Sequence, residues 1–222
     1  MSYNISKTCQ IHNLKAIYEK YFGIKKDGFF VEIGAFDGES FSNTSGLADY
    51  GWQGIYVEPV RSQFERCEQR HIKNNVKVLN CCIGTKEGEV TIYDGGSLST
   101  TDENQVDRYS NIDWSSHQKF NPQVCQQITL ERLLRENEVK KNFDLLIIDV
   151  EGQEPDVVNS FDITYWMPKM AIIELEDEHE SFIEYKEFCD SIKEVRTKFI
   201  DLGYVEVYRD KINTVYIYDN FQ

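Results

Sequence analysis

The stretch FFVEIGAFDGESFSNT, residues 29–44, gives the strongest indication of the fold. It opens on an apolar run and then brings together Glu32, Gly34, Asp37 and Gly38. Such a run, ending in glycines and acids, is typical of a buried strand that turns tightly into a helix. Both glycines would let the backbone pass close to a bound group, because they have no Cβ. The pattern also suits an ordinary turn between packed elements, so the rest of the chain has to decide.

Apolar runs and helical patterns alternate along the remaining sequence. Continuous apolar runs are typical of strands whose two faces are both buried. We predict strands at 28–34, 54–59, 76–84, 89–94, 143–152 and 170–176. We predict helices at 13–23, 39–51, 61–73, 130–137 (with Thr129 as N-cap), from Pro155 onward, and at 181–201. The final stretch, 204–220, alternates on either side of a polar turn and predicts an antiparallel hairpin.

Strand–helix alternation of this kind predicts an α/β fold. We expect a mostly parallel sheet with helices on both faces and a C-terminal antiparallel hairpin. A length of 222 residues suits a single domain over 1–222, with an N-terminal helical segment over 1–28. Ligands of open parallel sheets bind beyond the carboxyl ends of the strands. Several apolar runs end in acids, among them Glu32, Glu58 and Asp149, so we expect an acid-lined site at that rim.

The first turn favours a cationic ligand over a dinucleotide. Its spacing is G-x-x-x-G, and Phe36 stands where the dinucleotide motif has the glycine that admits a pyrophosphate. Asp37 would add negative charge at the same place, which suits the sulfonium and amino groups of S-adenosylmethionine. Glu58 lies 24 residues after Gly34, at the end of the next strand. An acid in that position can accept hydrogen bonds from both ribose hydroxyls.

Four stretches in this order resemble one family. FFVEIGAFDGESFSNT, GWQGIYVEP at 51–59, SLS at 97–99 and LLIIDVEGQE at 145–154 together resemble the FkbM family of S-adenosylmethionine-dependent methyltransferases. The resemblance implies a Rossmann-like methyltransferase fold with a seven-stranded sheet. It also implies methyl transfer to a hydroxyl of a sugar, a glycan or a small natural product. The expected cofactor contacts are Glu32, Gly34, Ala35, Asp37, Gly38, Ser42, Glu58, Pro59, Cys82, Ile83, Ser99 and Asp149.

Methyl transfer sets requirements for the acceptor side of the site. The acceptor oxygen must lie about 3 Å from the methyl carbon, in line with the breaking C–S bond, and a base must take its proton. Asp149 and Glu151 stand at i and i+2, so on an extended backbone they face the same side. They could hold the acceptor hydroxyl, or a divalent cation with its waters. We expect Asp149, Glu151 and His179 to be catalytic, with Glu174 and Glu176 as further candidate bases. A divalent metal is possible at these acids but is not predicted.

Residues 94–126 depart from the family pattern. This segment is long and polar, and loops of such length in compact domains are usually functional lids or disordered. We expect a substrate lid loop, with Arg108, Tyr109, Trp114 and His117 as candidate acceptor contacts. A mobile surface loop is the alternative.

Charge and cysteine usage narrow the choice of partners. With 24 basic and 38 acidic residues the net charge is −14, and no basic cluster could neutralise phosphates. Neither nucleic acid nor a membrane is therefore an expected partner, whereas a small-molecule or glycan acceptor is. The six cysteines form no C-x-x-C pair and are expected to be reduced packing residues. The N-terminus is polar and the sequence has no apolar run of about 18 residues. Together with the reduced cysteines, these features predict a cytoplasmic protein.

Two other functions fit parts of the pattern. A catalytically inactive module that binds S-adenosylmethionine would keep the cofactor pocket, although the intact acids Asp149 and Glu151 argue against it. A dinucleotide-dependent oxidoreductase would use the same sheet topology. Binding of S-adenosylhomocysteine measured against binding of NAD distinguishes these classes. The sequence indicates neither the acceptor nor the oligomeric state.

Overall fold

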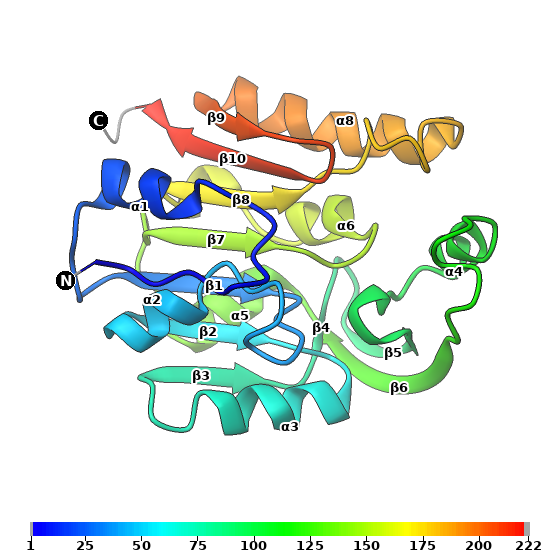
Figure 1. Cartoon of the computed structure of the whole chain (residues 1–222), viewed down its shortest axis with the longest axis horizontal. Helices are drawn as coiled ribbons and strands as arrows, with labels where there is room; N and C mark the ends of the chain where they lie inside the picture. The colour runs from blue at the N-terminus through cyan, green and yellow to red at the C-terminus, as the bar shows by residue number, and fades with distance from the viewer. Residues whose placement is uncertain (1, 220–222) are drawn as a thin grey trace.

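The computed structural model describes residues 2–219, and its central element is a twisted sheet (Figure 1). The strands of this sheet are β1 (Phe29–Ile33), β2 (Gln53–Val57), β3 (Val76–Leu79), β7 (Leu145–Ile148), β8 (Met170–Glu174), β9 (Tyr204–Arg209) and β10 (Asn213–Tyr218). Within the described residues they form a seven-stranded sheet in the order β3-β2-β1-β7-β8-β10-β9. Neighbours from β3 to β8 pair in parallel, and β10 is antiparallel to both β8 and β9. The predicted sheet and its C-terminal hairpin are confirmed; residue 220, predicted as part of the hairpin, lies outside the described residues.

Helices cover both faces of the sheet, as predicted. One face packs against α1 (Leu14–Phe22), α2 (Ser45–Tyr50) and α3 (Arg61–Arg70). The other packs against α5 (Leu130–Glu136), α6 (Glu154–Asn159), α7 (Ile163–Trp166) and α8 (Lys186–Asp201). Successive residues of a strand point to opposite faces, so Phe30 enters the first core and Val31 the second. All four residues of β7 are buried, each contributing about 1.5–3 kcal/mol relative to exposure, which explains the continuous apolar runs.

The turn after β1 is held by its neighbouring strands. The amides of Gly34 and Ala35 both donate to the carbonyl of Val57, each at 3.0 Å, and the amide of Asp149 donates to that of Ile33 at 3.0 Å. Gly34 has φ 88°, and a Cβ there would lie 1.6 Å from the carbonyl oxygen of Asp149. The adjacent strand end therefore requires this glycine. From the sequence we expected Gly34 to make room for a bound ligand. In the structure it makes room for the backbone of Asp149 instead.

A second sheet was not expected. It consists of β4 (Cys82–Ile83), β6 (Asn121–Ile128) and β5 (Gly88–Asp94), in that order. The strand predicted at 76–84 is wrong as one element, because the main-sheet strand ends at Leu79 and the chain then enters the second sheet. Asn80 stands at the break, and its Nδ2 donates to the carbonyls of Glu58 and Pro59, both at 2.9 Å.

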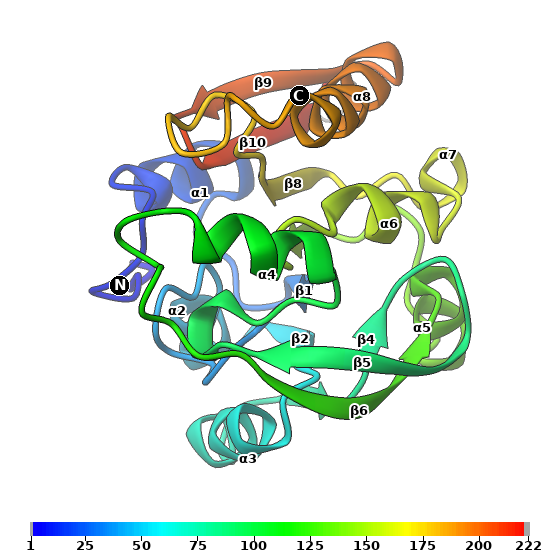
Figure 2. The same cartoon turned by 90° about the vertical axis from the view of Figure 1, so that its right-hand side faces the viewer.

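Residues 94–126, expected as a long loop, contain secondary structure, and their role as a substrate lid stays a prediction. They contain a 3-10 turn, η1 (Gly96–Leu98), the helix α4 (Glu103–Ser110) and the start of β6. Asp102 caps α4 by accepting from the amide of Asn104. Figure 2 looks at the carboxyl ends of the parallel strands and shows α4 and the second sheet lying over that end.

Two predicted helices are shorter than expected. The helix predicted at 39–51 begins at Ser45, because the chain before it forms the turn around Asp37, and it ends before Gly51 as predicted. The helix predicted at 181–201 begins at Lys186. Thr129 does cap α5, accepting from the amide of Arg132 at 3.1 Å, and Pro155 lies in the first turn of α6.

The N-terminal segment is packed against the sheet domain. The helix predicted at 13–23 is present as α1, and Tyr18 donates from its hydroxyl to the carbonyl of Asn43 at 2.9 Å. Residue 1 of the predicted 1–28 segment lies outside the described residues. None of the helices found between residues 2 and 219 combines the length and apolarity needed to cross a bilayer.

Candidate active site

A cavity of about 240 Å³ opens at the carboxyl ends of β1, β2, β7 and β8. It brings together most of the residues that the sequence predicted for the site. Those that line it are Glu32, Gly34, Ala35, Ser42, Glu58, Pro59, Cys82, Ile83, Ser99, Asp149, Glu151, Glu174, Glu176 and His179. Asp37 and Gly38 do not line it.

Asp37 is occupied by its own turn. Its carboxylate accepts from the amides of Glu39 and Ser40 and from Ser40 Oγ, and it pairs with Arg66 at 3.2 Å. Burial acts to raise the pKa of Asp37, but these hydrogen bonds and Arg66 outweigh it and hold the pKa below its usual range. Gly38 packs against α3, where a Cβ would lie 2.8 Å from Cys67 Sγ. Both residues therefore shape the turn and do not face the cavity.

Glu32 and Glu58 line the cavity with their carboxylates already bound by protein donors. Glu32 accepts from the hydroxyls of Thr44 and Ser42, and burial raises its pKa to about 7. Glu58 accepts from the amide of Phe36 at 2.9 Å and from that of Val60 at 2.8 Å. Burial raises the pKa of Glu58 to about 8. Each carboxylate oxygen has a second lone pair, so ligand hydroxyls can still donate to Glu58.

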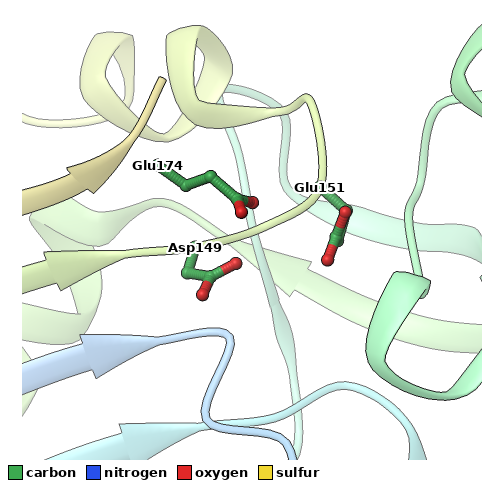
Figure 3. A group of neighbouring side chains, drawn as sticks. All are labelled: Asp149, Glu151 and Glu174. Atoms are coloured by element: carbon green, nitrogen blue, oxygen red, sulfur yellow. The ribbon is translucent and has the colours of Figure 1, made fainter. Parts of the chain in front are cut away.

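The opposite wall carries an acidic cluster, Asp149, Glu151, Glu174 and Glu176. Figure 3 shows the first three converging from the ends of β7 and β8. One carboxylate oxygen from each of these three lies within 4.8 Å of the others. Glu174 and Glu176 are only 8% exposed, and in residues 2–219 the Oε2 atom of each has no hydrogen-bond partner. Burial, followed by repulsion from neighbouring carboxylates, raises the pKa of Glu174 well above its usual value and that of Glu176 to about 8.

The turn after β7 fixes how this cluster is presented. Glu154 Oε1 accepts from the amides of Val150 at 3.0 Å and Gly152 at 3.3 Å. Between them Glu151 has φ 57°, a left-handed conformation that costs a non-glycine residue about 1–3 kcal/mol. The hydroxyl of Tyr109 in α4 donates to Glu151. The turn and the helix thus hold Glu151 at the cavity wall.

The other predicted residues divide between the cavity and the surface. His179 is half-buried, and its Nδ1 accepts from the amide of Ser181 at 3.2 Å. Tyr109 and Trp114 line the cavity, and Trp114 Nε1 donates to Ser181 Oγ at 3.2 Å across its mouth. Arg108 and His117 do not line it. Arg108 pairs with Asp102 at 2.8 Å, and His117 is exposed.

Several lining residues were not anticipated from the sequence. Gln10 and Ile212 come from segments at the two ends of the chain, where Asn213 Nδ2 donates to Gln10 Oε1 at 3.0 Å. No local pattern marks these two residues. Gln153 directly follows the DVEG motif, and its place in the turn after β7 was a usable signal.

The composition of the cavity wall fits S-adenosylmethionine. The described residues that line the cavity include six carboxylates, one histidine and no lysine or arginine. This wall suits a ligand that carries a sulfonium and an ammonium group and would repel a diphosphate. Apolar side chains of Val57, Ile83 and Ile92 line the same cavity and offer a surface for a purine ring.

The comparisons with known proteins agree with these features. The model of the methyltransferase FkbM domain matches residues 32–206. No curated protein matches the chain in sequence. Similar solved structures include an O-methyltransferase from Bacillus cereus in complex with SAH (13% identity, 98% of this chain and 84% of that chain, TM-score 0.49). A fibrillarin/Nop5p complex is also similar (12% identity, 88% of this chain and 74% of that chain, TM-score 0.47). So is an SAH-bound methyltransferase from Podospora anserina (9% identity, 86% of this chain and 71% of that chain, TM-score 0.46).

The family match confirms the resemblance and spans most of the chain. The strand order, the helices on both faces and the antiparallel β10 confirm the predicted Rossmann-like methyltransferase fold. Dependence on S-adenosylmethionine argues against the dinucleotide-dependent oxidoreductase. The chain belongs to the FkbM methyltransferase family and is an S-adenosylmethionine-dependent methyltransferase.

Proposed function

We propose that this methyltransferase acts on a hydroxyl group of a sugar, a glycan or a small hydroxylated natural product. The observation that carries the proposal is the division of one cavity into two walls. Glu32 and Glu58, at the ends of β1 and β2, have protein hydrogen-bond donors. In the acidic cluster at the ends of β7 and β8, Glu174 and Glu176 each keep one carboxylate oxygen that has no partner among the described residues. Hydroxyl groups are neutral donors that such oxygens can accept.

In this proposal the first wall, together with Asp149 of the acidic cluster, binds the cofactor. Glu58 accepts from the ribose hydroxyls, while Glu32 and Asp149 face the charged methionine part. Gly34, Ala35 and Ser42 line the same part of the cavity, and Pro59, Cys82, Ile83 and Ser99 complete the wall. When bound, S-adenosylmethionine supplies an electrophilic methyl group.

The second wall binds and orients the acceptor. Asp149 and Glu151 accept hydrogen bonds from the acceptor hydroxyl, and the hydroxyl proton passes to one of these carboxylates or to His179 as the oxygen gains the methyl group. Positioning of this kind supplies most of the acceleration, and the base adds roughly 10²–10⁴-fold. Trp114, 56% exposed at the cavity mouth, offers an aromatic face to a sugar ring. A net charge of −14 favours a neutral or cationic acceptor over an anionic one.

Incubation with methyl-labelled S-adenosylmethionine and an array of sugars, glycans and phenolic or polyketide alcohols tests the proposal. We expect label on oxygen, and none on the matching deoxy compounds. Glu151→Gln should lower kcat at least about 100-fold while leaving S-adenosylhomocysteine affinity unchanged. Glu184→Gln, which makes the same change on the exposed β8–α8 connection, should behave as the unmodified protein.

Two results would contradict the proposal. Label found on nitrogen or carbon would assign a different acceptor chemistry. Tight binding of S-adenosylhomocysteine without transfer to any member of the array would favour the inactive binding module.

A further inference from the structure

The acidic cluster contains buried oxygens for which the described protein provides no partner. Glu174 Oε2 and Glu176 Oε2 lack hydrogen bonds within residues 2–219, although both side chains are 92% buried, being 8% exposed. A buried carboxylate oxygen without a partner is costly. Glu174 also points toward the space between Asp149 and Glu151 (Figure 3). These observations indicate a missing ligand at this position.

The spacing of the oxygens fits a single bound ion. Three oxygens no more than 4.8 Å apart all lie within about 2.8 Å of one common centre, and Ca²⁺ takes oxygen ligands at about 2.3–2.6 Å. Small side-chain rotations would reach the distance of about 2.0–2.1 Å that Mg²⁺ requires. Asp149 and Glu174 lie at the ends of adjacent paired strands, and Glu151 is fixed by the turn that follows.

The charge around the cluster favours a divalent ion over an ammonium group. No lysine or arginine lies among the described residues of the cavity wall, and Arg108 is paired with Asp102 and Gln105. Bound S-adenosylmethionine has a net charge of about +1, from one sulfonium, one ammonium and one carboxylate. An ammonium group offsets one negative charge of this cluster when its carboxylates are ionised, whereas a divalent ion offsets two.

We propose that Asp149, Glu151 and Glu174 bind a divalent cation of the hard, oxygen-preferring type, Mg²⁺, Mn²⁺ or Ca²⁺, and that an acceptor hydroxyl completes its coordination. The second clause rests on the proposed function, whereas the cation site does not. All three protein ligands are carboxylates, which such ions prefer and which do not select zinc. The sequence left a divalent cation at Asp149 and Glu151 possible without predicting one, and this proposal goes beyond that expectation.

Tyr109 positions one of the three ligands. Its hydroxyl donates to Glu151, and its ring stacks on Phe120 and contacts Phe182 edge-on. Residues that orient metal ligands typically contribute 10–100-fold to metal affinity. Tyr109→Phe removes only the hydrogen bond to Glu151 and keeps the ring contacts with Phe120 and Phe182.

Direct cation binding tests the site without any acceptor. The full-length protein, treated with chelator and saturated with S-adenosylhomocysteine, is titrated with MnCl₂, MgCl₂ and CaCl₂ by calorimetry, and bound Mn²⁺ is followed by electron paramagnetic resonance. We expect one saturable site per chain. Glu174→Gln should weaken it at least about tenfold and Tyr109→Phe about 10–100-fold, whereas the exposed Glu184→Gln should leave it unchanged. Unaltered S-adenosylhomocysteine affinity without cation shows that each variant is folded.

Absence of saturable binding for all three ions, or binding that Glu174→Gln leaves intact, overturns the proposal. So does an amine-bearing acceptor that is methylated equally well before and after chelation, since it assigns the cluster to an ammonium group. Failure of the proposed function is distinguishable. If Mn²⁺ binds but no hydroxyl is methylated, the cation site stands and the acceptor class is wrong. If hydroxyls are methylated at full rate and no ion binds, only the cation site is wrong.

Discussion

The two walls of the cavity use buried carboxylates in opposite ways. Glu32 and Glu58 accept hydrogen bonds from hydroxyls and backbone amides of the first wall. Glu174 and Glu176 are also buried, but each leaves one oxygen without a partner in the part of the chain that the structure describes. The carboxylates of the first wall thus have protein donors, whereas two oxygens of the acidic cluster have none among residues 2–219. A buried polar group without a partner in a native structure is thus a guide to what binds there.

Gly34 lies between the ends of β2 and β7, and its replacement should lower the free energy of unfolding more than the other substitutions. Its φ of 88° is almost that of Gly203, 85°, but a Cβ would lie 1.6 Å from Asp149 O at the first position and 3.7 Å from Tyr218 at the second. Gly203→Ala should cost about 1–2 kcal/mol from backbone conformation alone. Gly34→Ala should cost at least about 3 kcal/mol more, or prevent folding, as measured by urea denaturation. Equal costs would show that the ends of β1 and β7 can separate.

Glu58 should make the stability of the ligand-free protein depend on pH. Burial raises its pKa to about 8, so the folded state holds this proton at pH values where the unfolded chain, with a pKa of about 4.3, has lost it. The stabilisation is complete below about pH 4.3 and is lost as pH rises through about 8, by a few kcal/mol. Urea denaturation between pH 5 and 8.5 should show a smaller decline for Glu58→Gln. If stability declines with pH as steeply in Glu58→Gln as in the exposed control Glu65→Gln, Glu58 is not the source of the pH dependence.

Affinity for S-adenosylhomocysteine should fall when Glu58 is replaced but not when Glu176 is replaced. At pH 8.5, where Glu58 is ionised, Glu58→Gln should weaken S-adenosylhomocysteine binding about 10–100-fold by calorimetry, as expected for lost hydrogen bonds to a charged group. Glu176→Gln should change it less than about twofold, because it lies on the other wall. Comparable losses in both variants would show that the cofactor also depends on Glu176, against the proposed division of the cavity.

Trp114 should have the smallest effect and act only on the acceptor. Trp114→Ala should raise the acceptor KM about three- to tenfold, since it removes an exposed aromatic face at the cavity mouth, and should leave the KM for S-adenosylmethionine unchanged. Trp114→Phe should recover most of the loss. If Ser181→Ala reproduces the full effect, the hydrogen bond from Trp114 to Ser181 matters and the ring face does not.

Local patterns were sufficient for the main sheet and for β5, predicted at 89–94 and present as Gly88–Asp94, but they missed β6. The strands β1, β2, β7 and β8 are buried on both faces and therefore appear as apolar runs in the sequence. Strand β6 has only two buried residues, Cys125 and Gln127, and its sequence is mostly polar. It is a strand because residues 121–127 pair with β5 and residues 127–128 also pair with β4. Such pairing depends on a partner elsewhere in the chain, so the sequence favoured a loop.

The sequence by itself determined that acids stand at the carboxyl ends of a parallel sheet, because strand periodicity and motif spacing are local properties. Only the tertiary structure decided which acids have partners. The carboxylate of Asp37 accepts hydrogen bonds within its own turn. Glu151 accepts a hydrogen bond from the hydroxyl of Tyr109, which lies 42 residues away in the sequence. One oxygen of Glu174 has no partner among residues 2–219. Hydrogen bonds join atoms that folding brings together from distant segments, and no spacing along the chain records them.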